Sequence, residues 1–399
     1  MPSAVIVDAV RTAGGKRNGK LSGWHPADLA AETLKALVDR NDLDPALIDD
    51  VIMGCVMQIG AQGVNVARNA VLAAGFPESV PATTIDRQCG SSQQSVHFAA
   101  QGVMAGAYDI VIAAGVEVMS LVPMGATMFA PGTGIPFGPK MMARYEAVGG
   151  LVPQGISAEL MADKWDLTRA DLDAYSARSH QRAQAATVEG RFEREIIPVA
   201  VKARDKESGQ VIEPDAMLAR DEGIRPDTTV ETLANLRAAF KPDGGKVTAG
   251  NSSQITDGAS AALIMSEECA AAGGYTPRAR FHSFALAGAD PILMLTAPIA
   301  ATTSVLERGK LRLDDIDLVE INEAFASVVL AWEKEHHPDM SRVNVNGGAI
   351  ALGHPLGASG TKLLATLLNE LERRGGRYGL QTMCEGGGLA NAMIIERLG

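Results

Sequence analysis

The stretch ATTIDRQCGSSQQSVHFAAQGVM, residues 82–104, decides the fold of this chain. Residues 82–85 are rich in β-branched side chains and favour an extended strand, and residues 91–104 are expected to form a helix. Cys89 and Gly90 lie in the turn that joins the two. Because a strand that leads directly into a helix is typical of βαβ units, this stretch predicts parallel strands covered by helices.

The same alternation continues in both directions along the chain, at residues 4–10, 27–40, 50–53 and 109–114. It predicts an α/β protein. A faint internal repeat accompanies it, since Ile48-Asp49-Asp50-Val51 and Ile316-Asp317-Leu318-Val319 are each followed, at the same distance, by a helix start, at Cys89 and at Gly357. Short strings can repeat by chance, but the pattern indicates two similar halves.

The composition excludes several classes of protein. The 399 residues carry 36 lysines and arginines against 47 aspartates and glutamates, a formal net charge of −11. Binding along the phosphates of a nucleic acid needs a surplus of cations, which this chain lacks overall. With 46% hydrophobic and only 4% aromatic residues, the predicted core is aliphatic, and the length suits two or three domains.

The chain shows no sign of a membrane anchor, a leader or a disulfide framework. Its longest apolar runs, such as residues 110–116, are far shorter than the ~20 residues of a membrane-spanning helix. The N-terminus is interpreted as a first strand and not as a signal peptide, which predicts a cytoplasmic protein. The four cysteines are too scattered for disulfides or a zinc site, so we expect free thiols and no metal.

Residues 120–155 interrupt the alternation with glycine, proline and methionine. A helical segment is expected over residues 157–189, and a polar stretch follows to about residue 245. Long irregular segments in compact proteins are usually functional or disordered. Roughly residues 120–250 are therefore predicted to form an inserted lobe with a lid-like loop.

Cys89 is the first candidate for chemistry. At the start of a helix its sulfur can face unpaired backbone N–H groups and the positive end of the helix dipole. That placement is expected to lower the pKa of the thiol and to raise the fraction of nucleophilic thiolate. A small buried structural cysteine is the alternative, to which we assign Cys55 and Cys269.

Further candidates lie beside glycines. His354 belongs to NVNGGAIALGHPLGASG, residues 344–360, whose glycines let backbone approach a ligand and hold the imidazole outside a helix. Cys384 precedes the triple glycine 386–388, whose N–H groups could form an oxyanion site, with a tight structural turn as the alternative. Asn322 could hold a water and Glu323 could start a helix, or the pair could be an ordinary N-cap.

Together these strings resemble the thiolase family through essentially the whole chain, from Val5, Asp8, Arg11 and Thr12 to the loop at residues 386–388. The resemblance implies a thiolase fold, with two similar halves in an α-β-α-β-α layered core, an inserted loop lobe that holds coenzyme A, and a homodimer or homotetramer. The implied bounds are residues 1–119 with 250–275 for the N-terminal half, 120–249 for the lobe and 276–399 for the C-terminal half.

The resemblance also implies a reaction. The enzyme would be an acyltransferase that cleaves a 3-ketoacyl-CoA by thiolysis or runs the reverse condensation, with coenzyme A as a substrate and no permanently bound cofactor. Cys89 would become acylated, His354 would activate it, and Cys384 would be the second acid/base. Asn322 and His354 would form one oxyanion hole through a water, and the amides of Cys89 and Gly386 would form the other.

For coenzyme A, the resemblance points to five residues, Arg225, Phe240, Ala249, Gly250 and Ser253. Because the chain is anionic overall, we expect its local cations at Lys202, Arg204, Lys206 and Arg225, with a merely solvated charged face as the alternative.

Two positions depart from the family pattern. Pro153-Gln154 stands where acetoacetyl-forming members often carry His-Met, so a preference for short acyl groups is not implied. Ala114-Gly115-Val116-Glu117 stands where Gly-Gly-Met-Glu is more usual, a difference that we expect to be structural only.

Three other functions compete with this interpretation. Decarboxylating, ketosynthase-like condensing enzymes of the same superfamily often use a second histidine or lack a counterpart of Cys384. A non-catalytic lipid carrier on the same fold would not need both cysteines and His354. A nucleotide-binding protein is suggested by GGKRNGK, residues 14–20, but Leu21 stands where a serine or threonine must reach magnesium.

Overall fold

The computed structural model describes residues 3–399, and its main sheet contains two groups of strands with matching order. The N-terminal group consists of β1 (Ala4–Thr12), β3 (Asp50–Gly54), β4 (Ala82–Ile85), β5 (Ile110–Val118) and β11 (Thr256–Ser266). These strands follow the order β4-β3-β5-β11-β1. Strand β3 is parallel to β4 and β5, whereas β11 is antiparallel to β5 and β1.

The C-terminal group repeats this arrangement with β12 (Ala279–Gly288), β13 (Leu318–Ile321), β14 (Tyr378–Glu385) and β15 (Leu389–Arg397). Its order is β13-β14-β15-β12, with β13 parallel to β14 and the other neighbours antiparallel. A parallel bridge between Val319 and Val343 takes the place of the fifth strand. Strands β1 and β12 pair over two residues and join the groups, so the predicted pair of similar halves is present.

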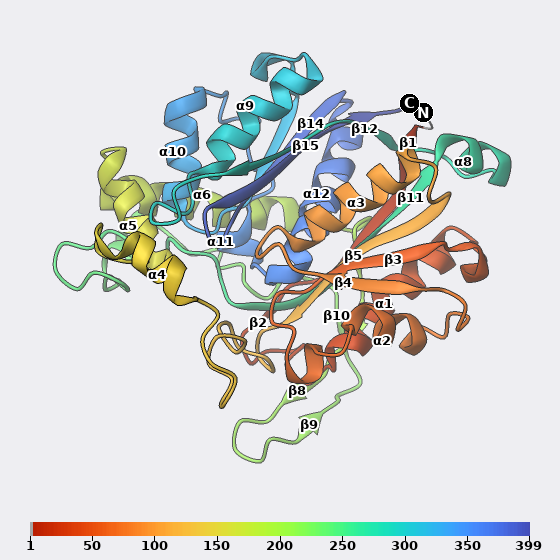
Figure 1. The fold of residues 1–399 in the computed structure, drawn as a ribbon, viewed down its shortest axis with the longest axis horizontal. Coiled ribbons are helices and arrows are strands. Elements are labelled where there is room, and N and C mark those ends of the chain that lie inside the picture. The colour runs from red at the N-terminus through yellow and green to blue at the C-terminus, as the bar shows by residue number, and fades with distance from the viewer. Residues whose placement is uncertain (1–2) are drawn as a thin grey trace.

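Helices complete five layers (Figure 1). Helices α3 (Ser91–Met104) and α12 (Ser359–Arg374) lie between the two groups of strands and contact both. Helices α1 (Pro26–Arg40) and α2 (Val66–Ala73) cover the outer face of the N-terminal group. On the opposite side, α9 (Ala297–Gly309) covers the C-terminal group and α10 (Ala326–His336) packs on α9. The predicted α-β-α-β-α order is thereby confirmed.

The first turns of the two central helices touch through small residues. A Cβ atom on Gly360 would lie 2.0 Å from the backbone nitrogen of Gln93, and the N–H of Thr361 donates to Ser92 Oγ at 3.1 Å. On the neighbouring strand, a Cβ on Gly115 would lie 2.2 Å from the carbonyl oxygen of Gly357. No larger side chain fits at these glycines, so they fix the separation of the two halves.

The segment between β5 and β11 contains α4 (Pro139–Glu146), α5 (Gln154–Lys164), α6 (Arg169–Val188) and α7 (Val230–Ala234). The helical segment expected over residues 157–189 is present as two helices, because the chain breaks between α5 and α6. Asp166 adopts a left-handed backbone conformation with φ 47°, and Thr168 then starts α6 with a capping box to Asp171. Both helices pack against α10, so they adjoin the C-terminal half.

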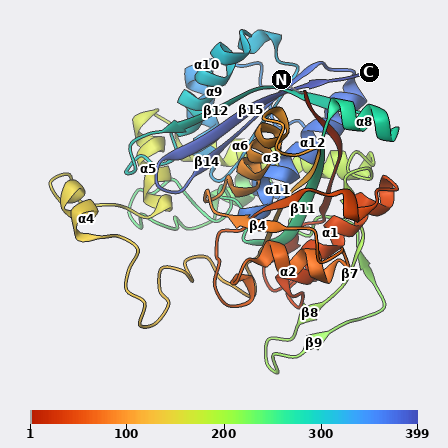
Figure 2. The same ribbon diagram turned by 45° about the vertical axis from the view of Figure 1, so that its right-hand side comes forward.

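Residues 120–153 carry the irregular loop that the sequence predicted, although α4 forms within it. Figure 2 shows α4 standing away from the layered core. No residue of α4 is buried, and the loop exposes Phe129 and Ile135. The exact limits of an inserted lobe, 120–249, and of the two halves stay predictions.

Shorter elements fill the remaining connections. They are β2 (Gly15–Lys16), β6 (Ile196–Ile197), β7 (Val199–Ala200), β8 (Ala203–Arg204), β9 (Val211–Ile212), β10 (Met217–Leu218), α8 (Glu267–Gly273) and α11 (Ala349–Leu352). None of the helices within residues 3–399 combines the length and the apolar character that a membrane crossing requires.

The loop that resembles a nucleotide-binding motif contacts carboxylates of its own chain. The N–H of Gly14 donates to Asp221 at 2.7 Å, and the N–H groups of Lys16 and Lys20 donate to Glu222 at 3.2 and 2.9 Å. Backbone donors that are satisfied by carboxylates do not bind a phosphate. The nucleotide-binding alternative is therefore contradicted by this geometry.

Gly360→Ala is expected to destabilise the protein by about 1–3 kcal/mol, because the added methyl group would force the two central helices apart. The measurement is the denaturant midpoint followed by circular dichroism. Gly288→Ala is the control, since a Cβ there meets no atom within 4 Å. Equal midpoints for the two variants would contradict the tight contact.

Candidate active site

Cys89 lies in a tight turn between β4 and α3. Gln88, the residue before it, adopts a left-handed backbone conformation with φ 48°, which is uncommon for a residue with a side chain. The N–H of Gly90 donates to Arg87 O at 3.1 Å, and the N–H of Ser91 donates to Gln88 O at 3.0 Å. This turn holds the cysteine at the first turn of α3, as the sequence predicted.

The Cys89 thiol has both polar and apolar neighbours. The backbone N–H of Gly386 and the side chain of Gln154 lie close enough to its sulfur to lower the pKa of the thiol. Around it lies an apolar cluster that contains Val56, Met57, Met119, Val122 and Leu356. The cysteine is only 6% exposed, so the reaction centre is almost dry.

Burial raises the pKa of Cys89 to about 12, and the nearby Glu385 carboxylate raises it further. The N–H groups of Gly386 and of Cys89 itself lower the pKa by less. The expectation that the helix N-terminus would lower the pKa of this thiol is therefore wrong for the unliganded protein. Desolvation of a thiolate outweighs a few backbone dipoles in a buried site.

Cys384 and Glu385 end strand β14 next to Cys89. Burial and the proximity of Cys89 raise the pKa of the Cys384 thiol well above its usual value. Burial also raises the pKa of Glu385 to about 8, and neither of its carboxyl oxygens has a hydrogen-bond partner within the described residues. Glu385 Oε1 lies 2.0 Å from where a Cβ on Gly90 would stand. Sequence reasoning missed Glu385, whose only signal was its position after Cys384.

The His354 imidazole is held from both ring nitrogens. Nδ1 lies 2.5 Å from Ser359 Oγ, and that hydroxyl donates to Pro355 O at 2.8 Å. Since the hydroxyl proton is committed to Pro355, Nδ1 carries the proton and donates to Ser359. Nε2 then carries no proton, and its lone pair faces the Asn322 amide nitrogen at 3.3 Å. Burial, and next the charge of Lys362, lower the pKa of His354 to about 3, so the imidazole is neutral.

Two buried glutamates fix the loops around these groups. Glu117 accepts hydrogen bonds from the N–H groups of Met57 and Gly357 at 3.1 and 2.9 Å, and so ties the loop after β3 to the loop after His354. Glu117 is common to this chain and the family pattern, so the structural interpretation of the differences at Ala114 and Val116 stays a prediction. Glu323 accepts from Tyr175 and Ser179, each at 2.7 Å, and does not start a helix, since α10 begins at Ala326.

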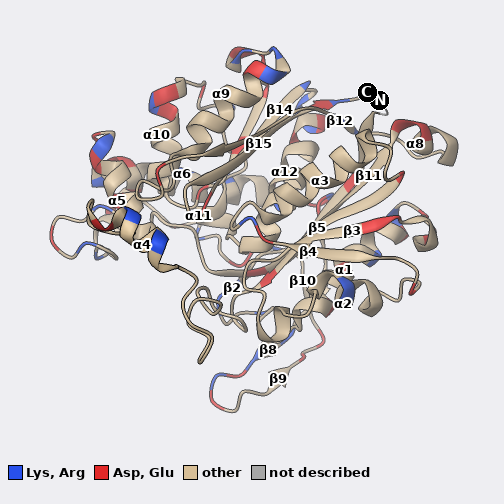
Figure 3. Ribbon diagram, viewed as in Figure 1, with Lys and Arg blue, Asp and Glu red and all other residues tan. Residues whose placement is uncertain are grey.

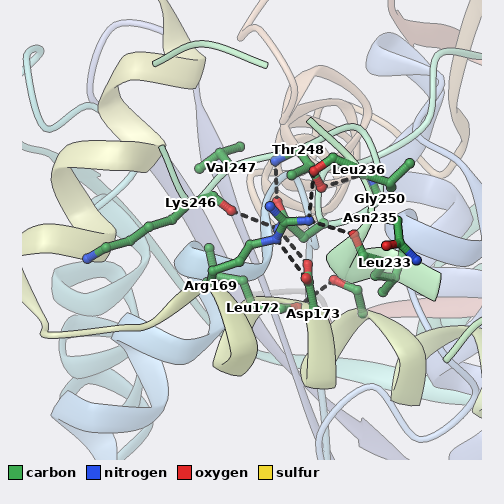
Figure 4. Close-up of polar contacts among 12 residues, drawn as sticks. Arg169, Leu172, Asp173, Leu233, Asn235, Leu236, Lys246, Val247, Thr248 and Gly250 are labelled. Carbon is green, nitrogen blue, oxygen red and sulfur yellow. Dashed lines mark hydrogen bonds and ion pairs between the residues drawn. The ribbon is translucent and has the colours of Figure 1, made fainter. Parts of the chain in front are cut away.

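A network on α6 holds the turn at residues 246–251 (Figure 4). Arg169 donates to Asp173 at 2.6 Å and to the carbonyls of Leu233 and Leu236 at 2.6 and 3.1 Å. Asp173 in turn accepts from Asn251 at 3.0 Å, and the oxygen of the Asn251 side chain accepts from the N–H of Thr248 at 2.8 Å. One arginine thereby positions α7 and the turn that contains Ala249 and Gly250.

The residues expected to contact coenzyme A lie near α5, α6 and α7. Arg225 is exposed, and its backbone N–H donates to His180 of α6 at 3.1 Å. Phe240 packs edge-on against Phe325 with ring centres 6.2 Å apart. Ala249 is exposed, Gly250 is covered by Leu233 and Leu236, and the N–H of Ser253 donates to Ala324 O at 2.9 Å.

The expected cation cluster is only partly supported. Lys202 pairs with Glu213 at 3.5 Å and lies over the ring of Trp24, and Arg204 donates to Gly209 O at 2.8 Å. Figure 3 shows basic and acidic residues side by side along the β8–β9 hairpin. The contacts favour the alternative of a solvated charged face for Lys202, Arg204 and Lys206. Of the four expected cations, Arg225 is then the remaining candidate for binding coenzyme A. Within residues 3–399, no three His, Cys, Asp or Glu side chains are grouped so that they could hold a metal ion.

Comparison with known proteins identifies the family. The thiolase N-terminal domain matches residues 4–268 and the thiolase C-terminal domain matches residues 275–397. The chain is 50% identical to the steroid 3-ketoacyl-CoA thiolase FadA6 of Mycobacterium tuberculosis, over 100% of this chain and 95% of that protein. It is 45% identical to the 3-ketoacyl-CoA thiolase of Photobacterium profundum, over 100% of both chains.

Solved structures agree with the sequence matches. Human mitochondrial 3-ketoacyl-CoA thiolase superposes with a TM-score of 0.86 at 37% identity, and Bacillus anthracis acetyl-CoA acetyltransferase with 0.87 at 38%. Each covers 100% of this chain and 99% of the known structure. The chain therefore belongs to the thiolase family. The expected thiolase fold and the expected acyltransferase activity, thiolytic cleavage or its reversal as condensation, are both confirmed.

Arg169→Met is expected to raise KM for coenzyme A about tenfold with little change in kcat, because it frees the turn that contains Ala249 and Gly250 while leaving the cysteines in place. Steady-state thiolysis at varied coenzyme A concentration measures this. Arg178→Met on the same helix is the control, since Arg178 stacks on Tyr175 and makes no hydrogen bond to the turn. An unchanged KM in Arg169→Met would show that the network does not position this turn for binding.

Proposed function

We propose that the chain cleaves 3-ketoacyl-CoA thioesters with Cys89 as the nucleophile, His354 as its base and Cys384 as the second acid/base. One observation carries this assignment. The two buried thiols belong to adjoining segments, since Glu385, the neighbour of Cys384, lies against Gly90, the neighbour of Cys89, and the proximity of Cys89 raises the pKa of Cys384. The loop of the neutral His354 packs against the same cluster through Leu356.

The first step transfers the acyl group to Cys89. Because the Cys89 thiol is protonated and His354 is neutral at pH 7, the proton passes to Nε2 as the sulfur attacks the 3-keto carbonyl. The N–H groups of Cys89 and Gly386 stabilise the charge on the attacked oxygen. The C2–C3 bond then breaks, and its electron pair moves into an enolate of acetyl-CoA.

The second half of the reaction returns both protons. Asn322 and the imidazolium of His354 stabilise the enolate oxygen, through the water that the family resemblance implies, and Cys384 protonates the enolate carbon. Acetyl-CoA leaves, and the Cys384 thiolate accepts the proton of an incoming coenzyme A thiol. That sulfur attacks the acyl group on Cys89, and His354 reprotonates the departing thiolate, which restores the resting enzyme.

The remaining expectations belong to the same proposal. Arg225, Phe240, Ala249, Gly250 and Ser253 would hold coenzyme A, with the Arg225 guanidinium free to pair with a phosphate. No permanently bound cofactor is needed for the steps above. A homodimer or homotetramer and a cytoplasmic location stay predictions from the sequence.

For the acyl group, we propose a substrate larger than acetoacetyl-CoA, including bulky groups derived from steroids. The support is the 50% identity to a steroid 3-ketoacyl-CoA thiolase and the surroundings of Cys89. Flexible thioethers line the cluster, and Met57 Sδ accepts a hydrogen bond from the N–H of Gly125 at 3.3 Å, which brings the irregular loop next to it. Methionine adapts its shape to irregular apolar ligands.

Cys384→Ala is expected to form the acetyl adduct on Cys89 but to lose exchange of the acetyl-CoA methyl protons, because the enolate has no proton partner. Intact mass measures the adduct, and NMR in deuterated water measures the exchange. Cys89→Ser is the control and should form no adduct. Wild-type exchange in Cys384→Ala, or an adduct in Cys89→Ser, would contradict the assigned roles.

Gln154→Met is expected to shift preference toward short substrates, because it restores a bulky thioether beside the Cys89 sulfur. The shift should be modest, since one or two methylenes of pocket shape are worth about 1–3 kcal/mol in discrimination. The measurement is the ratio of kcat/KM for acetoacetyl-CoA to that for a longer 3-ketoacyl-CoA. If the ratio does not change, Gln154 does not line the acyl pocket.

A further inference from the structure

Lys362 is a buried cation that the steps above do not use. It lies in the first turn of α12 and is 5% exposed. Its ammonium donates to the carbonyls of Leu352 and Gly353 at 2.6 and 2.9 Å. Both acceptors are backbone groups, and they belong to the two residues immediately before His354.

The segment before His354 needs such a partner. Helix α11 is only four residues long. The carbonyls at a helix C-terminus have no N–H donor within the helix and need a partner from elsewhere. Gly353 adopts φ 82°, and a Cβ there would lie 2.2 Å from Thr256 Oγ1. The N–H of His354 donates to that same hydroxyl at 3.1 Å. The backbone at His354 is thus held by Thr256 on one side and by Lys362 on the other.

Lys362 lines the same small cavity as both side-chain partners of the imidazole. The cavity, of about 10 Å³, is bordered by Asn322, Ser359, Lys362 and Glu320. Asn322 and Ser359 hydrogen-bond to Nε2 and Nδ1 of His354. Within the described residues, Asn322 Oδ1 and Glu320 Oε2 are buried without a hydrogen-bond partner.

We propose that Lys362 is a positioning residue for acyl transfer, which fixes the backbone before His354 and whose charge opposes protonation of the imidazole. This inference rests on the proposed role of His354 as the base. Lys362 touches no substrate and acts through the histidine loop and through its charge. Both the fixed backbone and the charge of Lys362 act on the proton transfer from Cys89 to His354.

The charges around Lys362 suit this role. Asp221, Glu195 and Glu320 favour the charged ammonium, Arg11 opposes it, and burial lowers the pKa of Lys362 to about 8. The amine is therefore mostly charged at pH 7. Its charge disfavours a second cation on His354, so removing it should raise the pKa of the imidazole. The acid limb of acylation, which needs the neutral imidazole, should then move to higher pH.

The test compares Lys362→Gln and Lys362→Arg in single-turnover acetylation of Cys89 by acetyl-CoA, read by intact mass after short incubations from about pH 2.5 to pH 8, so that the acid limb set by His354 is covered. Lys362→Gln is expected to acetylate about tenfold more slowly at pH 7 because the loop is less well positioned. Its acid limb is expected at higher pH than that of the wild type. Lys362→Arg keeps the charge and should recover most of the rate and the original limb.

Asn369→Leu is the matched control, because Asn369 is buried two turns further along α12 and donates to Ala365 O at 2.8 Å but not to the histidine loop. It should lower the melting temperature without moving the acid limb. The inference is overturned if Lys362→Gln slows acetylation no more than its lower melting temperature explains and its acid limb stays at the wild-type pH. If Lys362→Gln does not fold, Lys362→Met and Lys362→Arg replace it. The inference is then overturned if Lys362→Met has the rate and the acid limb of the wild type. It is also overturned if Lys362→Arg, which keeps the charge, is slow and has a shifted acid limb.

His354→Ala separates this inference from the proposed function. If His354→Ala acetylates like the wild type, the proposed role of His354 fails. If His354→Ala loses acetylation while both Lys362 variants keep the wild-type rate and limb, only the role of Lys362 fails.

Discussion

The contact between the first turns of α3 and α12 is the constraint on which the site depends. Both helices begin at the same place in the molecule, where Gly360 lies against the backbone of Gln93. Each helix start carries one part of the chemistry, Cys89 ahead of α3 and the His354 loop ahead of α12. Because only glycine permits this approach, the distance between the proposed nucleophile and base is set by backbone packing and not by long side chains.

A dry site of this kind keeps its groups neutral until substrate arrives. Burial holds the pKa of Cys89 at about 12 and that of His354 at about 3, so neither a thiolate nor an imidazolium accumulates. Glu385, with a pKa of about 8, is mostly protonated at pH 7 and then adds no negative charge beside the sulfur. The proton therefore moves together with the attack of the sulfur, at a point where the oxyanion donors are already in place.

The sequence predicted the layered fold and the groups that meet in the site, and it missed what depends on burial. Glycine strings around Cys89, His354 and Cys384 are local signals, and a helix start can be read from neighbouring residues. The raised pKa of Cys89 could not be read in this way, since it results from side chains far apart in the chain. The same holds for Glu117 and Glu323, which tie together loops of different elements. From the sequence, Glu117 was only one residue of a stretch expected to be structural, and Glu323 was only a possible helix start.

The location of the site follows from strand direction. Cys89, Asn322 and Cys384 follow or end β4, β13 and β14, each of which runs parallel to a neighbouring strand. The carboxyl ends of parallel strands meet at one edge of a sheet, where loops can vary without disturbing the pairing. The repeat places one such edge in each half, and the touching central helices bring the two edges together. The proposed reaction centre thus draws its nucleophile from one half and its base and second thiol from the other.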